Sequence, residues 1–132
     1  FSGGVKYPEK VEAFYKNDLS KELLNTAVKA SQDFFNGKHF NSTATGEGLG
    51  SYLDYLKTIR NGEQLSSIIN KQYATIFTAN ATLNNSFSNQ VNTDNAKMIL
   101  AYDALQQNVI YTKLDMMQAL NITIDYIDSD GD

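Results

Sequence analysis

Proline almost never interrupts this chain. Pro8 is the only proline in 132 residues, and four of the eight glycines lie between residues 37 and 50. Proline and glycine are the residues that disfavour helix interiors most strongly, so long stretches of the chain are free to form helices. The sequence therefore predicts an all-α fold.

Apolar residues recur at helical spacing in four stretches of the chain. This spacing places them on one face of each helix, and the polar residues occupy the other face. The pairs Asn36-Gly37 and Asn61-Gly62 are typical of helix ends, because glycine and asparagine adopt left-handed backbone angles readily. The four predicted helices span residues 19–35, 49–60, 63–83 and 94–120.

The first predicted helix shows the pattern most clearly. Asp18 is expected to cap its start, and Glu22 lies in its first turn, where negative charge is favourable. Its predicted core-facing stripe consists of Leu23, Leu24, Ala27, Val28, Ala30, Phe34 and Phe35.

The connections between these helices are polar and mostly short. Residues 37–50 are expected to form a loop, and residues 84–92 a polar connection that Phe87 and Val91 anchor in the core. Asn121 is expected to end the last helix in a left-handed turn. Four amphipathic helices joined in this way pack most simply as an up-and-down four-helix bundle. The predicted architecture is one such domain over residues 1–132, with a short extended C-terminal tail.

Composition and charge exclude several classes of function. The net charge is −4 and the isoelectric point is near 4.9, which argues against nucleic-acid binding and against simple attraction to anionic membranes. No apolar run is long enough to span a bilayer. The chain contains no cysteine, so disulfides, thiolate nucleophiles and cysteine-bound zinc are excluded.

His39 is the only histidine and the first candidate metal ligand. It lies in a glycine-rich loop, where Ser42 and Glu47 are the nearest possible oxygen donors. A metal site needs several donors in compatible geometry, and a serine hydroxyl is a poor substitute for a carboxylate. The alternative interpretation is a histidine beyond a helix C-terminus, where partial positive charge is favourable.

The acidic tail is the second candidate metal site. Asp128, Asp130 and Asp132 alternate in the manner of the first residues of a calcium loop, but the carboxylate that would complete such a loop is absent. The alternative interpretation is a solvated acidic chain end.

Polar residues also interrupt the apolar pattern of the last predicted helix. Lys113, Asp115 and Gln118 form a candidate interface with another domain, and an ordinary polar face is the alternative. Lys113 and Asp115 are two residues apart, so they point to different sides of a helix and do not pair.

Three segments resemble one protein family. They are KASQDFFNGKHFNSTATGEGLGSYLDYL, INKQYATI and the region from residue 94 to the end, whose last part, ALNITIDYIDSDGD, is the most specific. These segments resemble the C-terminal half of imelysin-like proteins of the Bacteroidetes type. The family's motif is Gly-x-His-x-x-Glu, and Gly37-Lys38-His39 is followed by Ser42 in place of the glutamate.

The resemblance implies both a partner and a role. The partner would be an N-terminal helical bundle of the same protein. The protein would be exported to the periplasm or the cell surface, possibly as a lipoprotein, and would bind iron, zinc or calcium in metal acquisition. The alternative is the half of an imelysin-type metallopeptidase that lacks the motif, and a third possibility is a free-standing module that oligomerises through an exposed apolar face.

Overall fold

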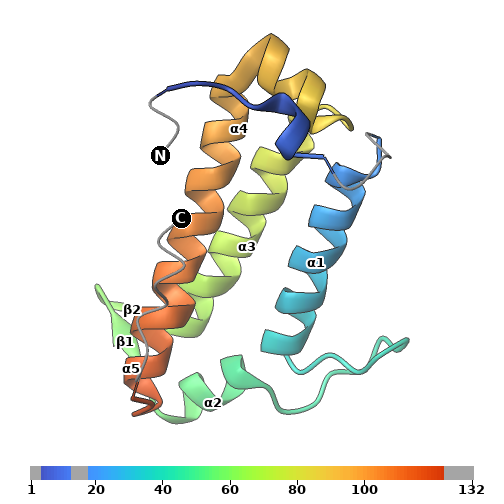
Figure 1. Cartoon of the computed structure of the whole chain (residues 1–132). Helices are drawn as coiled ribbons and strands as arrows, with labels where there is room; N and C mark the ends of the chain where they lie inside the picture. Colours follow the sequence, from blue (N-terminus) through green and yellow to red (C-terminus); the bar gives the residue numbers. More distant parts are fainter. Residues whose placement is uncertain (1–3, 13–17, 124–132) are drawn as a thin grey trace.

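The computed structural model describes residues 4–12 and 18–123, and nearly all of its regular structure is helical (Figure 1). The predicted all-α fold is therefore confirmed. A short hairpin is formed by β1 (Ile59–Arg60) and β2 (Glu63–Gln64). The helices are η1 (Pro8–Lys10, a 3-10 turn), α1 (Ser20–Phe35), α2 (Leu49–Tyr55), α3 (Leu65–Ala81), α4 (Phe87–Val109), η2 (Ile110–Met116, a π-helix) and α5 (Met117–Ala119).

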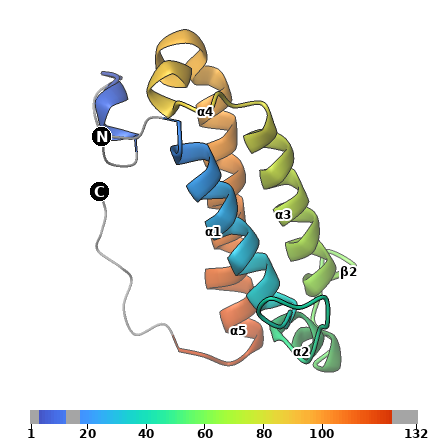
Figure 2. The same ribbon diagram turned by 90° about the vertical axis from the view of Figure 1, so that its right-hand side faces the viewer.

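Helix α3 lies at the centre of the arrangement. Helices α1 and α4 both pack against it, and the short α2 lies across one end of the three long helices (Figures 1 and 2). Isolated amphipathic helices are marginally stable in water, so contact with α3 stabilises its neighbours. Four large apolar side chains at the middle of the core are fully buried: Leu53, Leu65, Ile69 and Ile76.

A ladder of side-chain hydrogen bonds sets the register between α1 and α3. The two helices are antiparallel, so residues further along α1 meet residues earlier on α3. Buried polar groups stabilise a structure only when they are paired, and a shift of one turn would break all of these pairs. The ladder consists of Asn25–Asn80 (2.9 Å), Ser31–Tyr73 (2.7 Å) and the reciprocal amide pair Asn36–Asn70 (2.9 and 3.0 Å).

The second helix is shorter than the sequence predicts. Helix α2 ends at Tyr55, and Lys57 then adopts a left-handed conformation with φ of 54°. Asn61 and Gly62 also have positive φ, at 51° and 83°, and form the turn between β1 and β2. Asn-Gly favours a two-residue hairpin turn as strongly as it favours a helix end, and here it makes the turn.

Helix α4 begins earlier than predicted and bends at Asp94. Its first turns occupy part of the segment expected to be a connection, and the backbone of Asp94 is non-helical (φ −153°, ψ 79°). Gln90 is 2% exposed and holds the bend, because its amide donates to the Asp94 carbonyl (2.6 Å) and accepts from the Asn84 N–H (2.8 Å). Phe87 and Val91 are buried, which confirms them as anchors.

The last helix changes its winding rather than its direction. After Val109 the backbone follows a π-helix over seven residues, and α5 completes the last turn. Helix therefore continues almost to Leu120, as predicted. Asn121 has φ of 54°, which confirms the left-handed end.

Glu12 joins the starts of two helices. The predicted cap at Asp18 is wrong, because Leu19 occupies the N-cap position of α1 and no side chain caps it. Instead, Ser20 Oγ donates to one Glu12 oxygen (2.6 Å), and Ser86 Oγ and the Ser88 N–H donate to the other (both 2.6 Å). The carboxylate thus lies at the N-terminal ends of α1 and α4, where the helix dipoles favour negative charge.

These contacts determine the ionisation of Glu12. Desolvation raises its pKa, but the hydrogen bonds from Ser20, Ser86 and the backbone around Ser88 together outweigh it, so the pKa of Glu12 lies below its ordinary value of 4.5. A carboxyl group whose pKa is lower in the folded than in the unfolded chain stabilises the fold above the unfolded pKa. That contribution disappears as the pH falls through the folded pKa.

We predict that Glu12→Gln lowers the free energy of unfolding by about 1–2 kcal/mol at pH 7, because hydrogen bonds to a charged acceptor are lost. The difference from the unaltered chain should shrink as the pH falls below 4.5. Urea unfolding followed by circular dichroism at pH 7 and pH 3 measures both effects. The exposed Glu9 supplies the control, and Glu9→Gln should change little. A pH-independent deficit in Glu12→Gln would contradict the assignment.

Candidate docking face

Half of the apolar stripe of α1 is exposed. Val28 and Phe35 are buried against α3, at 7% and 2% exposure, as predicted. Leu23 and Phe34 belong to the same predicted stripe but are 53% and 74% exposed, so their predicted burial is wrong. The exposed members lie on one side of the helix at spacings of three and four residues. We call Leu23, Ala27, Ala30 and Phe34 the α1 stripe.

Helix α4 and η2 carry a second exposed apolar stripe. Their buried contacts with α3 are made by small residues, chiefly Ala101 and Ala104. The large side chains on another side are between 40% and 58% exposed. We call Ile99, Tyr102, Val109, Ile110 and Leu114 the α4 stripe.

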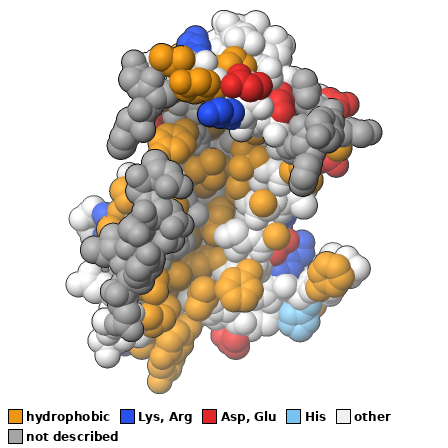
Figure 3. Space-filling model, viewed as in Figure 1, with side chains coloured by type: hydrophobic (Ala, Val, Ile, Leu, Met, Phe, Trp, Pro, Cys, Tyr) orange, Lys and Arg blue, Asp and Glu red, His pale blue; other side chains and the backbone are white. Residues whose placement is uncertain are grey.

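The two stripes belong to one exposed surface, which we call the open face. Figure 3 looks into the hollow between α1 and α4, where hydrophobic side chains lie on the floor and along both sides. Seventeen large apolar side chains of the described residues are exposed, against ten that are buried. A monomeric protein rarely presents so much contiguous apolar surface, and such a surface is typical of an interaction site.

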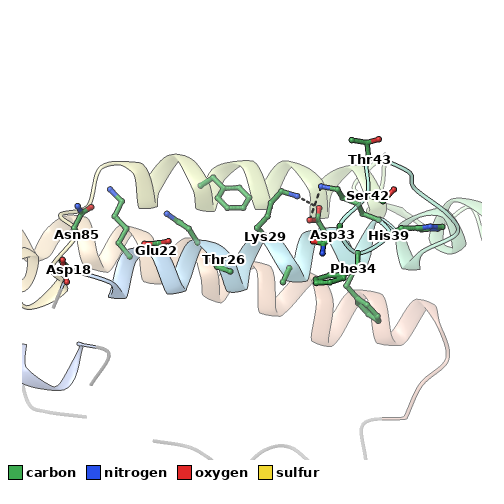
Figure 4. Close-up of a pocket in the computed structure, with 17 residues that line it drawn as sticks. Asp18, Glu22, Thr26, Lys29, Asp33, Phe34, His39, Ser42, Thr43 and Asn85 are labelled. Atoms are coloured by element: carbon green, nitrogen blue, oxygen red, sulfur yellow. Dashed lines mark hydrogen bonds and ion pairs between the residues drawn. The ribbon is translucent and has the colours of Figure 1, made fainter. Parts of the chain in front are cut away.

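The other side of α1 is polar and borders a different hollow. This hollow has a volume of about 1160 Å³, and Figure 4 shows Phe34 pointing to the opposite side of α1 from Lys29 and Asp33. Lys29 and Lys38 both form ion pairs with Asp33. The hydrogen bond from Lys29 is the main cause that lowers the pKa of the Asp33 carboxyl. The charges beside this hollow thus largely neutralise one another.

His39 lies at the end of the polar hollow, in the loop after α1 (Figure 4). Its backbone N–H donates to the Ala44 carbonyl (3.0 Å), and its ring lies against Gly46, where a Cβ atom would approach Nε2 to 2.9 Å. The other oxygen donors considered have local partners. Ser42 Oγ accepts from the Ala44 N–H (3.0 Å), and Glu47 accepts from Ser51 (2.7 Å). The loop therefore does not bring these groups together around His39.

The remaining metal candidates, Asp128, Asp130 and Asp132, lie outside the described residues. Within residues 4–12 and 18–123, no three histidine, cysteine or acidic side chains gather in a way that could hold a metal ion. The predicted calcium loop thus stays a prediction.

The three predicted interface residues have different environments. Lys113 and Gln118 are exposed, on η2 and α5, whereas Asp115 points inward toward β1. Arg60 Nε lies 2.9 Å from Oδ2 of Asp115, and the guanidinium covers the ring of Tyr111 at 4.7 Å. The contact with Asp115 is an ion pair without a directed N–H, because that buried oxygen accepts no hydrogen bond from the described residues.

Arg60 was not identified from the sequence, which placed it at the end of a helix. Its position in a hairpin brings it against a π-helix, and π-helical turns are common at functional sites. The structure also separates Asp115 from Lys113 and Gln118. Asp115 fixes the end of the bundle, and only the other two remain accessible to a partner.

The chain was compared with known proteins. No family model matches it, and no curated protein or solved structure is significantly similar to it. None of the helices in its described part is long and apolar enough to cross a membrane.

We predict that Arg60 and Asp115 stabilise each other. In a double-mutant cycle of Arg60→Met and Asp115→Asn, the coupling energy should be about 1 kcal/mol, because removing one partner leaves a half-buried charge alone. Urea unfolding of the four proteins measures it. The exposed pair Lys29–Asp33 on α1 is the control and should give a smaller coupling. Equal coupling in the two pairs would contradict a special role for Arg60.

Proposed function

We propose that this chain is a docking module, which acts by covering a partner with its open face. The observation that carries the proposal is the exposure of the α1 stripe, above all the 74% exposure of Phe34. Apolar area left in water costs roughly 25 cal/mol per Å², so a partner that covered this face would gain that free energy. The described residues offer no comparable cluster of reactive side chains.

The resemblance to imelysin-like proteins suggests which partner this is. We propose the N-terminal helical bundle of such a protein, located in the periplasm or at the cell surface. The open face would then form one wall of a junction between the two bundles. Ligands from the other bundle would complete a site for metal or iron acquisition. Lys113 and Gln118 are the exposed polar residues that are available to such a junction.

The imelysin-type metallopeptidase is the second role that the resemblance allows. It needs a histidine and glutamate set from the other half, because Ser42 replaces the motif's glutamate here. Both roles require the same docking, so hydrolysis by the joined halves, and its absence, would distinguish them.

We predict that Leu23→Glu weakens docking without unfolding the chain, because an exposed position tolerates a charge and an apolar contact does not. Binding of the dye ANS should fall at least twofold, and self-association in sedimentation velocity should decrease. The helical signal in circular dichroism should stay unchanged.

Leu100→Glu is the matched control. Leu100 is 64% exposed but lies away from Tyr102 around α4, so this change should affect dye binding and self-association little. Equal effects of the two substitutions, or no effect of Leu23→Glu, would show that the open face is not a docking surface.

A further inference from the structure

We propose that the partner segment on the open face is a single amphipathic α-helix that runs antiparallel to both α1 and α4. This inference rests on the proposed docking function and specifies its occupant. The first argument is direction. Helices α1 and α4 run the same way on two sides of α3, which runs opposite to both (Figures 1 and 2). A helix antiparallel to α1 and α4 would occupy the fourth position of an up-and-down bundle.

The second argument concerns the backbone of the occupant. The walls of the hollow are helices, whose interior N–H and carbonyl groups are already paired within each helix. An extended segment buried there would leave its own polar backbone groups without partners, which is costly. The short strands β1 and β2 lie at one end of the molecule and offer no edge along the hollow (Figure 1). A helix satisfies its own hydrogen bonds and avoids this cost.

The third argument is the shape of the α1 stripe. The small residues Ala27 and Ala30 lie between the larger Leu23 and Phe34. In helix packing, a side chain of one helix enters a hole formed by four residues of the other. The alanine pair forms a shallow hole, so a large apolar side chain of the partner, such as leucine, fits over it.

The fourth argument is size. Helix α1 has 16 residues and is about 24 Å long at 1.5 Å per residue, so a partner helix of about 16–18 residues would span the face. The seven large side chains of the two stripes, at roughly 100 Å² each, present about 700 Å². This area is close to the ~800 Å² that each partner contributes to a stable interface.

The fifth argument is charge. Lys113 is exposed beside Leu114, and none of the described residues forms an ion pair with it. The N-terminus of an antiparallel partner helix would lie at this end of the face. Acidic residues are favourable in the first turn of a helix. The partner helix is therefore expected to carry a carboxylate there that meets Lys113.

A designed peptide tests the proposal. The probe is an 18-residue fluorescent helix with leucines along one face and two glutamates in its first turn, and fluorescence anisotropy measures its binding to the full chain. We expect Ala30→Glu to weaken binding at least tenfold and Lys113→Glu to weaken it severalfold. Ala74→Glu changes an exposed alanine of α3 outside the open face and should stay within twofold of the unaltered chain.

Disulfide trapping tests the direction. The chain has no cysteine, so a single introduced thiol is unique. In the antiparallel arrangement, Phe34→Cys should cross-link to a cysteine near the N-terminus of the peptide, and Leu23→Cys to one near its C-terminus. The opposite pairing would overturn the proposed direction.

The remaining outcomes separate this inference from the proposed function. If the peptide does not bind while Leu23→Glu still reduces dye binding and self-association, docking stands and the single helix is wrong. If the chain instead forms a tight dimer that Ala30→Glu dissociates, the occupant is a second copy, and the inference is also wrong. If Leu23→Glu and Ala30→Glu both have no effect, both proposals fail.

Discussion

The arrangement depends on the apolar face of α3. Leu65, Ile69 and Ile76 are fully buried on this helix, and α1, α2 and α4 each obtain their core contacts from it. One helix can bury side chains against only so many neighbours, and α3 meets its neighbours on one half of the bundle. The outer halves of α1 and α4 have no equivalent support from the described residues. The open face follows directly from this uneven distribution of contacts.

Polar side chains determine how the helices are aligned on α3, while apolar burial supplies most of the stabilisation. The paired asparagines and the Ser31–Tyr73 contact fix one register between α1 and α3, because each alternative register leaves buried amides unpaired. Gln90 plays the same part at the bend of α4. These contacts make the walls of the open face rigid, and a preformed surface loses less entropy when it binds.

The helices could be predicted from the sequence because helical periodicity is a local signal. The helix ends were less predictable: Asn61-Gly62 suits a helix end and a hairpin turn equally well, and only the packing of β1 decides between them. The α1 stripe contained a signal that was missed. Its seven apolar residues cover roughly 160° of the helix, more than the ~100° that one neighbour buries. The partnership of Arg60 with Asp115 depends on tertiary contact and had no local signal.

Glu12 has a consequence for the order of folding. Its carboxylate binds Ser20, eight residues away, but also Ser86 and Ser88, which are 74 and 76 residues away. Closing so long a loop costs more entropy than forming the hairpin of α3 and α4, whose connection is short. The hairpin is therefore expected to form early, and the junction at Glu12 to close among the last steps. The bond that holds two helix starts together in the native state would then contribute to the rate of unfolding more than to the rate of folding.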